Sequence, residues 1–573
     1  MYQRVAGRQI PFFSTSQKTF MKKTLIVLVV LIAVGIASFL WLRSRIGITD
    51  PARVVPADAV AVVIFPDLPR SVMRWPQTAM AKIGVEPEVS AFLEKPLGQV
   101  AGERGGDEAG KLLLGLKPGR VFAALTALGG DRASVVIGFQ YWGSKEEFDE
   151  AVAGFRRAVY RGAEPGAEVS DLEGIEVLST PMQGGHLYSA SVGHWGFLSN
   201  DSAALVEAAR RARGTEAPNL ADDRIYQSVI ARLPSEPDLI AFVRVGPVLD
   251  TLLAVGEKMG AEADEEQVAP LRKAQAAGFA MKLDGVNMRD ATFVLRPDPP
   301  DTGTLTHTGM AFTSQETLGY FDALLGLKAM SDLASNPALG NVLPPGAGGI
   351  SRLLQSLPEA LANEASLSFS WPPGTMRPDI LLSAGVKEAA LAEQILMQAV
   401  SMLPETTVAE TDGMRVFSFP SLRSPLANPS VALGEKDVLI ALDPGEIAGA
   451  LARKEAAAPL RTSPAFAPAE AAFQSANESF GYLDARGIFE RTYPMLRQMV
   501  VFGAALVPGA ADVIDATKLP ETESIAKHLG PIVFAQTRVA DGYLTESSGP
   551  ITMHQLFLIG VGAGAAFLPG QSD

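Results

Sequence analysis

The hydrophobic pattern of the chain opens with a run of 18 uncharged residues, Leu25–Leu42 (LIVLVVLIAVGIASFLWL). As a helix rising about 1.5 Å per residue, this run spans roughly 27 Å, close to the thickness of a bilayer's hydrocarbon core. Basic residues flank both ends, and Trp41 stands where aromatic residues gather at a membrane interface. The pattern predicts a transmembrane signal anchor over residues 25–42.

A cleavable signal peptide is the alternative, because Met21-Lys22-Lys23 resembles a second start and Gly35-Ile36-Ala37 resembles a cleavage site. The stretch after Ala37 stays largely apolar up to Arg43, which favours an uncleaved anchor. Lysine and arginine are more frequent before the run than after it, so the positive-inside rule predicts residues 1–24 in the cytoplasm. We therefore expect a single-pass protein of a bacterial inner membrane, with its C-terminal body in the periplasm.

Two stretches of the body, about 240 residues apart, follow the same order of patterns. In each, a turn enters an alternating strand, as in Ser170–Ser179 and Glu410–Ser418. Another strand and an Ala-rich helix follow, and then a strand runs into a helix with a glycine at the same place, Gly246 or Gly487. This repetition favours an internal duplication.

Each stretch closes on a candidate hairpin that contains Asp-Gly, Gly278–Leu295 in the first and Pro531–Glu546 in the second. The proline-rich segment Arg296–Gly303 separates the two stretches as a linker. We interpret the body as two copies of one unit, residues 55–300 and residues 305–550.

Within each unit, strands alternate with helices. In the first, Ala133–Tyr141 is β-rich, and Ser144–Glu147 forms a capping box whose helix places Phe148, Val152 and Phe155 on one face. The corresponding strand and helix of the second unit are Asp379–Gly385 and Ala389–Met402. Hairpins and mixed spacing do not suit continuous βαβ winding, so we predict an α+β fold with mainly antiparallel sheets.

Residues 551–573 form an apolar C-terminal tail, in which Ile551–Leu568 contains His554, Gln555 and three glycines. These residues favour a tail that is buried or packed on the surface of the body. A segment that returns to the membrane is the alternative.

Charge narrows the class of partner. The formal net charge is −14; residues 1–50 contribute +6 of it, so the remainder carries −20. An acidic body repels phosphate backbones, which excludes nucleic acid as a partner. The chain has no cysteine, so disulfides, thiolate metal ligands and cysteine nucleophiles are excluded as well.

We nominate no catalytic, metal-binding or cofactor-binding residue. The histidines are His186, His194, His307, His528 and His554. They form no His-Glu-x-x-His motif, so a zinc hydrolase has no visible ligand set. His186 and His194 flank a predicted hairpin and could approach each other, but no carboxylate stands at a fixed spacing from them.

Several motifs imitate enzyme signatures, and we interpret each as a chance match. Gly105–Leu112 has the spacing of a phosphate-binding loop, but Leu112 replaces the hydroxyl that would hold magnesium. Gly560–Gly564 imitates a dinucleotide loop without the βαβ unit it needs. Ser524–Lys527 has Ser-x-x-Lys spacing without its companion motifs. The acidic run Glu262–Gln267 lacks the spacing of a calcium loop.

The order of elements adds a resemblance. Val55–Asp58 leads into the strand Ala59–Phe65, Lys95–Gly98 follows, and Tyr482–Asp484 comes late in the chain. With the anchor, this order resembles uncharacterised bacterial envelope proteins that carry a single N-terminal transmembrane anchor and a domain of unknown function. The resemblance implies a location and a fold type, and no site residues.

The leading hypothesis is a non-enzymatic, membrane-tethered periplasmic protein that binds a partner or ligand or has a structural role, without a cofactor. The alternative is a periplasmic carrier or chaperone for lipids or other apolar ligands, because helices over an antiparallel sheet can enclose an apolar pocket. An envelope enzyme of an unrecognised type is the third hypothesis.

Overall fold

The computed structural model describes residues 50–557, apart from 104–114, 130–131, 160–165, 183–184, 259, 261–264, 328–354, 373–374, 376, 402, 404, 425–426, 457–458, 474–475 and 507–514. The predicted anchor and most of the apolar tail lie outside the described residues, so both stay predictions. Within the described ranges, no helix combines the length and the apolar character that crossing a membrane requires.

The strands of the first half are β1 (Ala61–Phe65), β2 (Val121–Gly129), β3 (Arg132–Gln140), β4 (Glu168–Leu172), β5 (Ile175–Met182), β6 (Gly185–Val192), β7 (Trp195–Ser199), β8 (Leu239–Arg244), β9 (Ala276–Asp284) and β10 (Asn287–Leu295). Those of the second half are β11 (Thr317–Leu324), β12 (Leu361–Ser370), β13 (Asp379–Val386), β14 (Thr407–Thr411), β15 (Met414–Ser418), β16 (Ser430–Leu433), β17 (Asp437–Ala441), β18 (Ser479–Asp484), β19 (Pro531–Val539) and β20 (Gly542–Gly549).

The helices of the first half are α2 (Leu68–Arg74), α3 (Ala79–Gly84), α4 (Pro87–Glu103), α6 (Lys145–Val159), α7 (Ser202–Ala212), α8 (Arg224–Ile230), α9 (Val245–Lys258) and α10 (Glu265–Arg272). Those of the second half are α14 (Ala389–Ser401), α15 (Pro444–Ala456), α16 (Phe466–Ala471), α17 (Ala485–Leu506) and α19 (Thr522–Ala526). Short 3-10 helices include η1 (Pro51–Arg53) and η4 (Thr308–Phe312).

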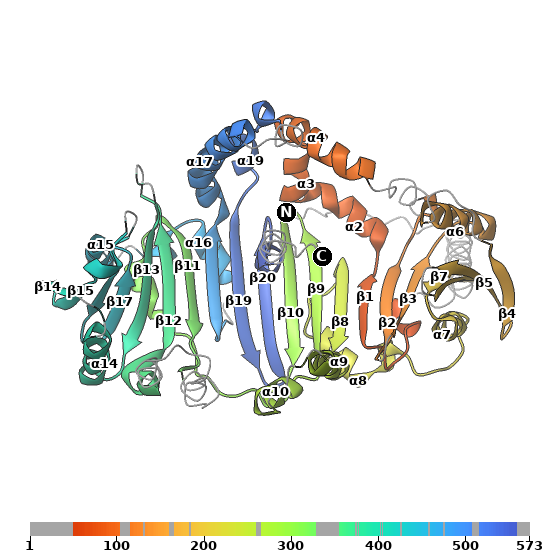
Figure 1. Ribbon diagram of the computed structural model, residues 1–573, viewed down its shortest axis with the longest axis horizontal. Coiled ribbons are helices and arrows are strands. Elements are labelled where there is room, and N and C mark those ends of the chain that lie inside the picture. Colours follow the sequence, from red (N-terminus) through yellow and green to blue (C-terminus); the bar gives the residue numbers. More distant parts are fainter. Residues whose placement is uncertain are drawn as a thin grey trace, which may run out of the picture.

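The described strands form one 20-stranded sheet, and every pair in it is antiparallel (Figure 1). From edge to edge the pairings give the order β4-β5-β6-β7-β3-β2-β1-β8-β9-β10-β20-β19-β18-β11-β12-β13-β17-β16-β15-β14. The two halves of this order correspond. If β11–β20 are matched in turn with β1–β10, the strands follow the same order inward from either edge of the sheet. The predicted α+β class with antiparallel sheet is confirmed.

The two halves meet in the middle of the sheet. β10 pairs with β20 along its whole length, from Met288 opposite Gly549 to Leu295 opposite Gly542. The sequence predicted sheets within two units, whereas the structure joins all strands into one, because each half would otherwise expose the edge of a long strand there.

One face of the sheet, here called the back face, carries the main core. Directly paired residues point to the same face, and Ala124, Val62 and Phe242 are such buried residues of β2, β1 and β8. Helices α7 and α8 cover this face in the first half, and α15 and α16 cover it in the second. Phe466 of α16, for example, packs edge-on against Tyr482 of β18 at 4.9 Å between ring centroids.

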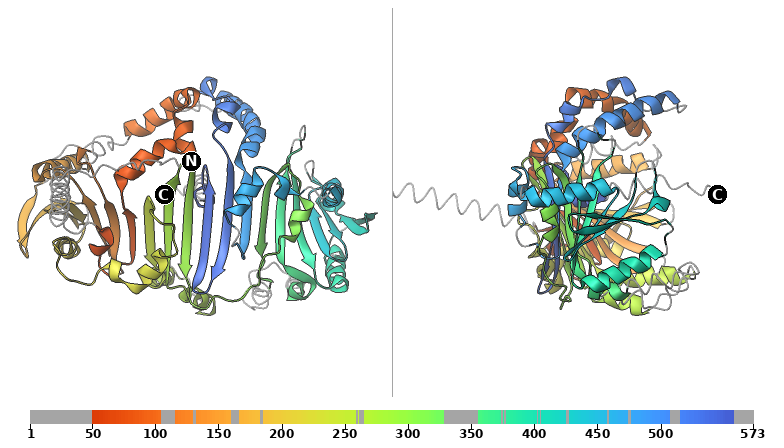
Figure 2. Two further views of the ribbon diagram at one scale, coloured as in Figure 1. Left: turned by 180° about the vertical axis from the view of Figure 1, so that it is seen from behind. Right: turned by 90° about the vertical axis from the view of Figure 1, so that its left-hand side faces the viewer.

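The opposite face, here called the front face, carries α6, α9, α14 and α17 (Figure 1). Phe148 of α6 packs on Phe139 of β3, at 5.8 Å between ring centroids. α9 contacts β2 and β9, and α17 contacts β11, β18 and β19. Seen from the side, these helices and the outer strands lie on the same side of the central strands, so the front face is the inner side of a curve (Figure 2).

The structure contains the capping box and the turns that short sequence patterns predict. Ser144 and Glu147 form the predicted capping box: each side chain accepts the other's backbone N–H, at 3.2 and 2.8 Å. The turns before β5 and β15 share one backbone conformation, since Glu173-Gly174 and Asp412-Gly413 all have positive φ. Both predicted Asp-Gly hairpins are present, as β9–β10 and β19–β20.

A first prediction concerns the core at the centre of the sheet. Phe293 of β10 is fully buried on the back face, so Phe293→Ala should lower the midpoint of chemical denaturation by the equivalent of about 3–5 kcal/mol. Phe502→Ala is the matched control, because Phe502 is 67% exposed and its loss should change stability by less than about 0.5 kcal/mol. Circular dichroism follows the denaturation of both variants. Equal denaturation midpoints for Phe293→Ala and Phe502→Ala would contradict this packing.

Candidate functional site

The Ser-x-x-Lys motif of α19 does not form a serine–lysine pair. Ser524 Oγ donates to Glu88 Oε2 at 2.8 Å, whereas Lys527 Nζ binds Glu86 Oε1 at 2.9 Å. His528 Nε2 also contacts Glu86 Oε1, at 2.6 Å. Hydrogen bonds from Lys527 and His528 lower the pKa of Glu86, so this carboxylate stays charged. The motif therefore joins α19 to the start of α4, where the two halves meet above the sheet (Figure 1).

The structure does not describe the other motifs that imitate enzyme signatures. Gly105–Leu112, Gly560–Gly564 and the start of the acidic run Glu262–Gln267 lie outside the described residues. No group of three or more His, Asp or Glu residues within the described ranges is placed to hold a metal ion.

The structure does not bring His186 and His194 together. His186 is the second residue of β6 and His194 lies in the turn after this strand, so the extended strand separates the two histidines. His186 stacks on Tyr188 at 5.9 Å between ring centroids, and His194 packs against Trp142 at 5.7 Å. Both histidines therefore act as partners of aromatic side chains.

A buried polar cluster lies on the back face beneath η4. His307 Nδ1 contacts Asp322 Oδ2, and the Tyr320 hydroxyl donates to the same oxygen at 2.9 Å. The Asp322 side chain is fully buried, and its Oδ1 has no hydrogen-bond partner in the described part of the chain. Glu364, directly beyond, accepts the backbone N–H groups of Thr306 and Thr308 at 2.6 and 2.9 Å.

The hydrogen bond to Asp322 is the largest cause that raises the pKa of His307 above its ordinary value, so the charged imidazolium is favoured beside this carboxylate. Burial is the largest cause that raises the pKa of Tyr320, which stays a neutral donor. The arrangement resembles part of a catalytic dyad, but Asp322 and Glu364 use their hydrogen bonds to hold residues 306–308 at the start of η4. We interpret it as a device that fixes the segment around His307, whose backbone has a positive φ of 56°.

The front face has a different character, because it exposes apolar side chains. One row of directly paired, front-facing residues crosses the first half from β7 to β9: Leu198, Ile137, Ala123, Val63, Ala241 and Phe279. Ile137 and Val63 are 39% and 37% exposed. Their neighbours along the strands, such as Val62 and Val136, are buried on the back face.

A matching row crosses the second half. From β19 to β17 it consists of Phe534, Gly481, Phe321, Leu367, Leu382 and Ile440. Leu367, Leu382 and Ile440 are 38–41% exposed. Gly481 leaves room for an aromatic ring to lie across its strand, since a Cβ there would come within 2.6 Å of Phe321.

Charge is nearly absent from this face. In the described, paired segments of the strands from β7 to β17, only Asp290 and Arg538 are front-facing residues with a charged side chain. Charged residues of the same strands point to the back instead, as Arg289 and Glu546 do, which pair at 2.6 Å. The interior of the front face is thus apolar, partly exposed and nearly free of charge, which makes this face the candidate site.

The two rows converge on His554, which follows β20. Its ring packs edge-on against Phe279 of one row at 6.0 Å and Phe534 of the other at 6.4 Å. His554 Nδ1 lies 2.7 Å from Asp290 Oδ1, and its Nε2 lies 3.3 Å from Thr292 Oγ1. The sequence left His554 in an apolar tail; its partner Asp290 is distant along the chain, so no local pattern could reveal the contact.

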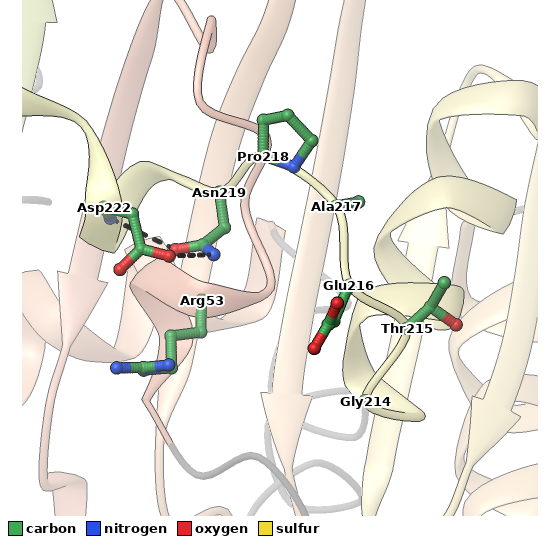
Figure 3. A pocket seen from close by; sticks show the side chains of 8 residues that line it. All are labelled: Arg53, Gly214, Thr215, Glu216, Ala217, Pro218, Asn219 and Asp222. Atoms are coloured by element: carbon green, nitrogen blue, oxygen red, sulfur yellow. Dashed lines mark hydrogen bonds between the residues drawn. The ribbon is translucent and has the colours of Figure 1, made fainter.

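A separate open groove lies beside η1 (Figure 3). Arg53, Glu216 and Asp222 line it, with Asp222 also bonded to Asn219 at 2.8 Å. The groove carries charges of both signs, whereas the two rows of the front face carry none. It therefore does not share the chemistry of the front face.

Comparison with known proteins gives little. No family model and no curated protein matches the chain. Among solved structures, crystal forms I, III and IV of TP0453 are similar at TM-score 0.24 and 10% sequence identity. They cover 43–44% of this chain and 80–82% of that chain. Similarity at this level carries no argument about fold or function.

A second prediction concerns His307. Because its folded-state pKa is raised, the stabilisation that it contributes is complete below the unfolded-state value of about 6.5 and is lost as pH rises through the folded value. His307→Gln, which cannot titrate, should flatten the fall in denaturation midpoint above about pH 6.5. His186→Gln is the matched control and should keep the slope of the parent. An unchanged slope in His307→Gln would mean that the Asp322 contact does not stabilise the fold.

Proposed function

We propose that the protein binds an acyl-chain ligand on the front face of its sheet and acts as a non-enzymatic lipid-binding protein, a carrier or chaperone. One observation carries the proposal: two uncharged rows of front-facing residues remain partly exposed in the interior of a sheet. Burying a half-exposed leucine or isoleucine against hydrocarbon is favourable at roughly 25 cal/mol per Å² of apolar surface. A bound chain would provide that burial.

The shape of the surface favours a lipid over a protein partner. Each row crosses six strands, and with strands about 4.8 Å apart it extends about 24 Å. One leaflet of a bilayer's hydrocarbon core is about 15 Å thick, so each row is long enough for an acyl chain. Protein interfaces, in contrast, surround an apolar centre with a polar rim and concentrate Tyr, Trp and Arg.

The helices beside the rows support the same proposal. α17 exposes Met495, Met499 and Phe502 at 47%, 61% and 67%, and α9 exposes Leu252 at 64%. An open groove along α17 has a volume of about 710 Å³ and includes Val501 and Phe502 in its lining. Flexible methionine and phenylalanine side chains adapt to ligands of varied shape.

Two further features belong to the proposal. The equal order of strands counted from either edge supports two copies of one unit, as the sequence predicts for residues 55–300 and 305–550. The predicted anchor over residues 25–42 would hold the acidic body at a bacterial inner membrane, on its periplasmic side, where lipid ligands are at hand.

A third prediction tests the front face. Leu382→Glu places a charge in the middle of one row and should reduce the lipid that co-purifies with the full chain by about tenfold, because a carboxylate against hydrocarbon costs well over 1 kcal/mol. Val408→Glu is the matched control, since Val408 lies on the edge strand β14 and is 59% exposed. Mass spectrometry of extracted lipids gives the measurement.

Two outcomes would contradict the proposal. One is the absence of lipid from the purified parent chain. The other is equal lipid in the parent and in Leu382→Glu, which would locate the lipid away from the front face. Equal denaturation midpoints for both variants establish that neither effect comes from unfolding.

A fourth prediction tests the tether. The full chain expressed in a bacterium should fractionate with membranes and keep its N-terminal residues, because an uncleaved anchor resists extraction by high salt or alkali. Peptides from residues 1–24, detected in the membrane fraction by mass spectrometry, give the measurement. A soluble periplasmic body that begins just after Ala37 would support the cleavable signal peptide instead.

A further inference from the structure

We infer that the front face selects a neutral lipid, whose uncharged, hydroxyl- or ester-bearing head lies at the centre of the sheet and whose chains follow the two rows. This inference rests on the proposed function and adds the class of ligand. It depends on what separates the two rows and on the charges within reach.

A polar strip begins where the first row ends at Phe279 and then runs beside Phe534 and Gly481, the start of the second row. Thr292 of β10 pairs directly with Thr545 of β20, Thr545 with Gln536 of β19, and Gln536 with Ser479 of β18. These four residues continue the line of Phe279 across the centre of the front face, so apolar side chains give way to hydroxyl and amide groups there. Three strand spacings of about 4.8 Å give the strip a length of about 14 Å.

The strip offers free hydrogen-bonding groups. Thr545 and Gln536 are partly exposed, and their side chains form no hydrogen bond within the described part of the chain. Thr292 bonds only weakly to His554, at 3.3 Å. Hydroxyl and amide groups both donate and accept hydrogen bonds, which suits the hydroxyl and ester oxygens of a glycerol-type head.

The charges near the strip are already paired. Asp290 is fully buried and is held by His554 and by the Thr552 hydroxyl. Arg538, at the end of β19, bonds the carbonyl oxygens of Pro300 and Gly303 and pairs with Asp301 at 2.8 Å. No other cation faces the front in the described strands from β7 to β17, so a phosphate would meet no fork of donors of the kind that binds it.

The rest of the molecule adds to this discrimination. An acidic body, at −20 beyond residue 50, opposes the approach of an anionic ligand. A neutral head, in contrast, loses nothing to this field and gains hydrogen bonds in the strip. Acyl chains alone would fill the rows equally well for both ligands, so the head decides between them.

Native mass spectrometry of the full chain, released from detergent micelles, can test the inference with three probes at equal concentration. The probes are dioleoylglycerol, dioleoylphosphatidylglycerol and squalene, which have a neutral head, an anionic head and no head. Dioleoylglycerol adducts should exceed those of each other probe by about fivefold, which corresponds to about 1 kcal/mol. Leu382→Glu should remove the excess, which separates binding on the front face from binding to the anchor.

Gln536→Lys provides the variant that tests the strip itself. A lysine there supplies the cation that the strip lacks, so the variant should favour the anionic lipid by about tenfold more than the parent does. Thr407→Lys on β14 is the matched control, because Thr407 is exposed on an edge strand far from the strip and should leave the ratio unchanged.

The outcomes separate the two proposals. Equal adducts with the neutral and anionic lipids, or no response to Gln536→Lys in a variant with a parental denaturation midpoint, would overturn the neutral head while leaving the apolar rows in place. Squalene adducts as abundant as those of dioleoylglycerol would also overturn the neutral head, because squalene has no head. If Leu382→Glu removes none of the lipid adducts, lipid binding on the front face is overturned altogether.

Discussion

The ladder between β10 and β20 is the interaction on which the rest of the molecule depends. These two strands pair over eight positions, from Met288 to Leu295, and without the pairing each half would end in the exposed edge of a long strand. Because paired residues share a face, the ladder also sets the front faces of both halves on one side. A single junction therefore creates one continuous front face out of two.

The same alternation gives the two faces their separate roles. On the back, helices α7, α8, α15 and α16 complete the core, and the charged residues of the central strands find partners there, as Arg289 does with Glu546. On the front, α6 and α14 cover the ends of the sheet and α9 and α17 cover only part of its middle. The apolar residues in between, such as Ile137 and Leu382, keep more than a third of their surface in contact with solvent.

Much of the local structure could be predicted from the sequence, because its causes lie within a few residues. The capping box at Ser144 needs only the glutamate three positions later, and the turn at Asp412-Gly413 needs only a glycine with positive φ. The strand Ala133–Tyr141 was also predicted, as β3 confirms with Arg132–Gln140. What its pattern does not reveal is which of its apolar residues face a core and which stay exposed.

The candidate site could not be predicted, because its causes are long-range. Asp290 and His554 lie 264 positions apart and meet only when β10 has paired with β20. The row Phe321–Leu367–Leu382–Ile440 likewise depends on strand register, and its last step joins β13 to β17, which are not neighbours in the chain. Sequence patterns that stood out, such as Ser524–Lys527, serve instead to join α19 to α4.

At the centre of the sheet, the two halves differ in the side chains that they contribute. Phe279 and Phe534 occupy corresponding strands, β9 and β19, and contact His554 from both sides. The segment that carries His554 follows β20 alone, so one half supplies a side chain that covers the boundary between both. Two similar apolar rows thus meet at a single polar place, which is why we propose a ligand with similar chains and one distinct head.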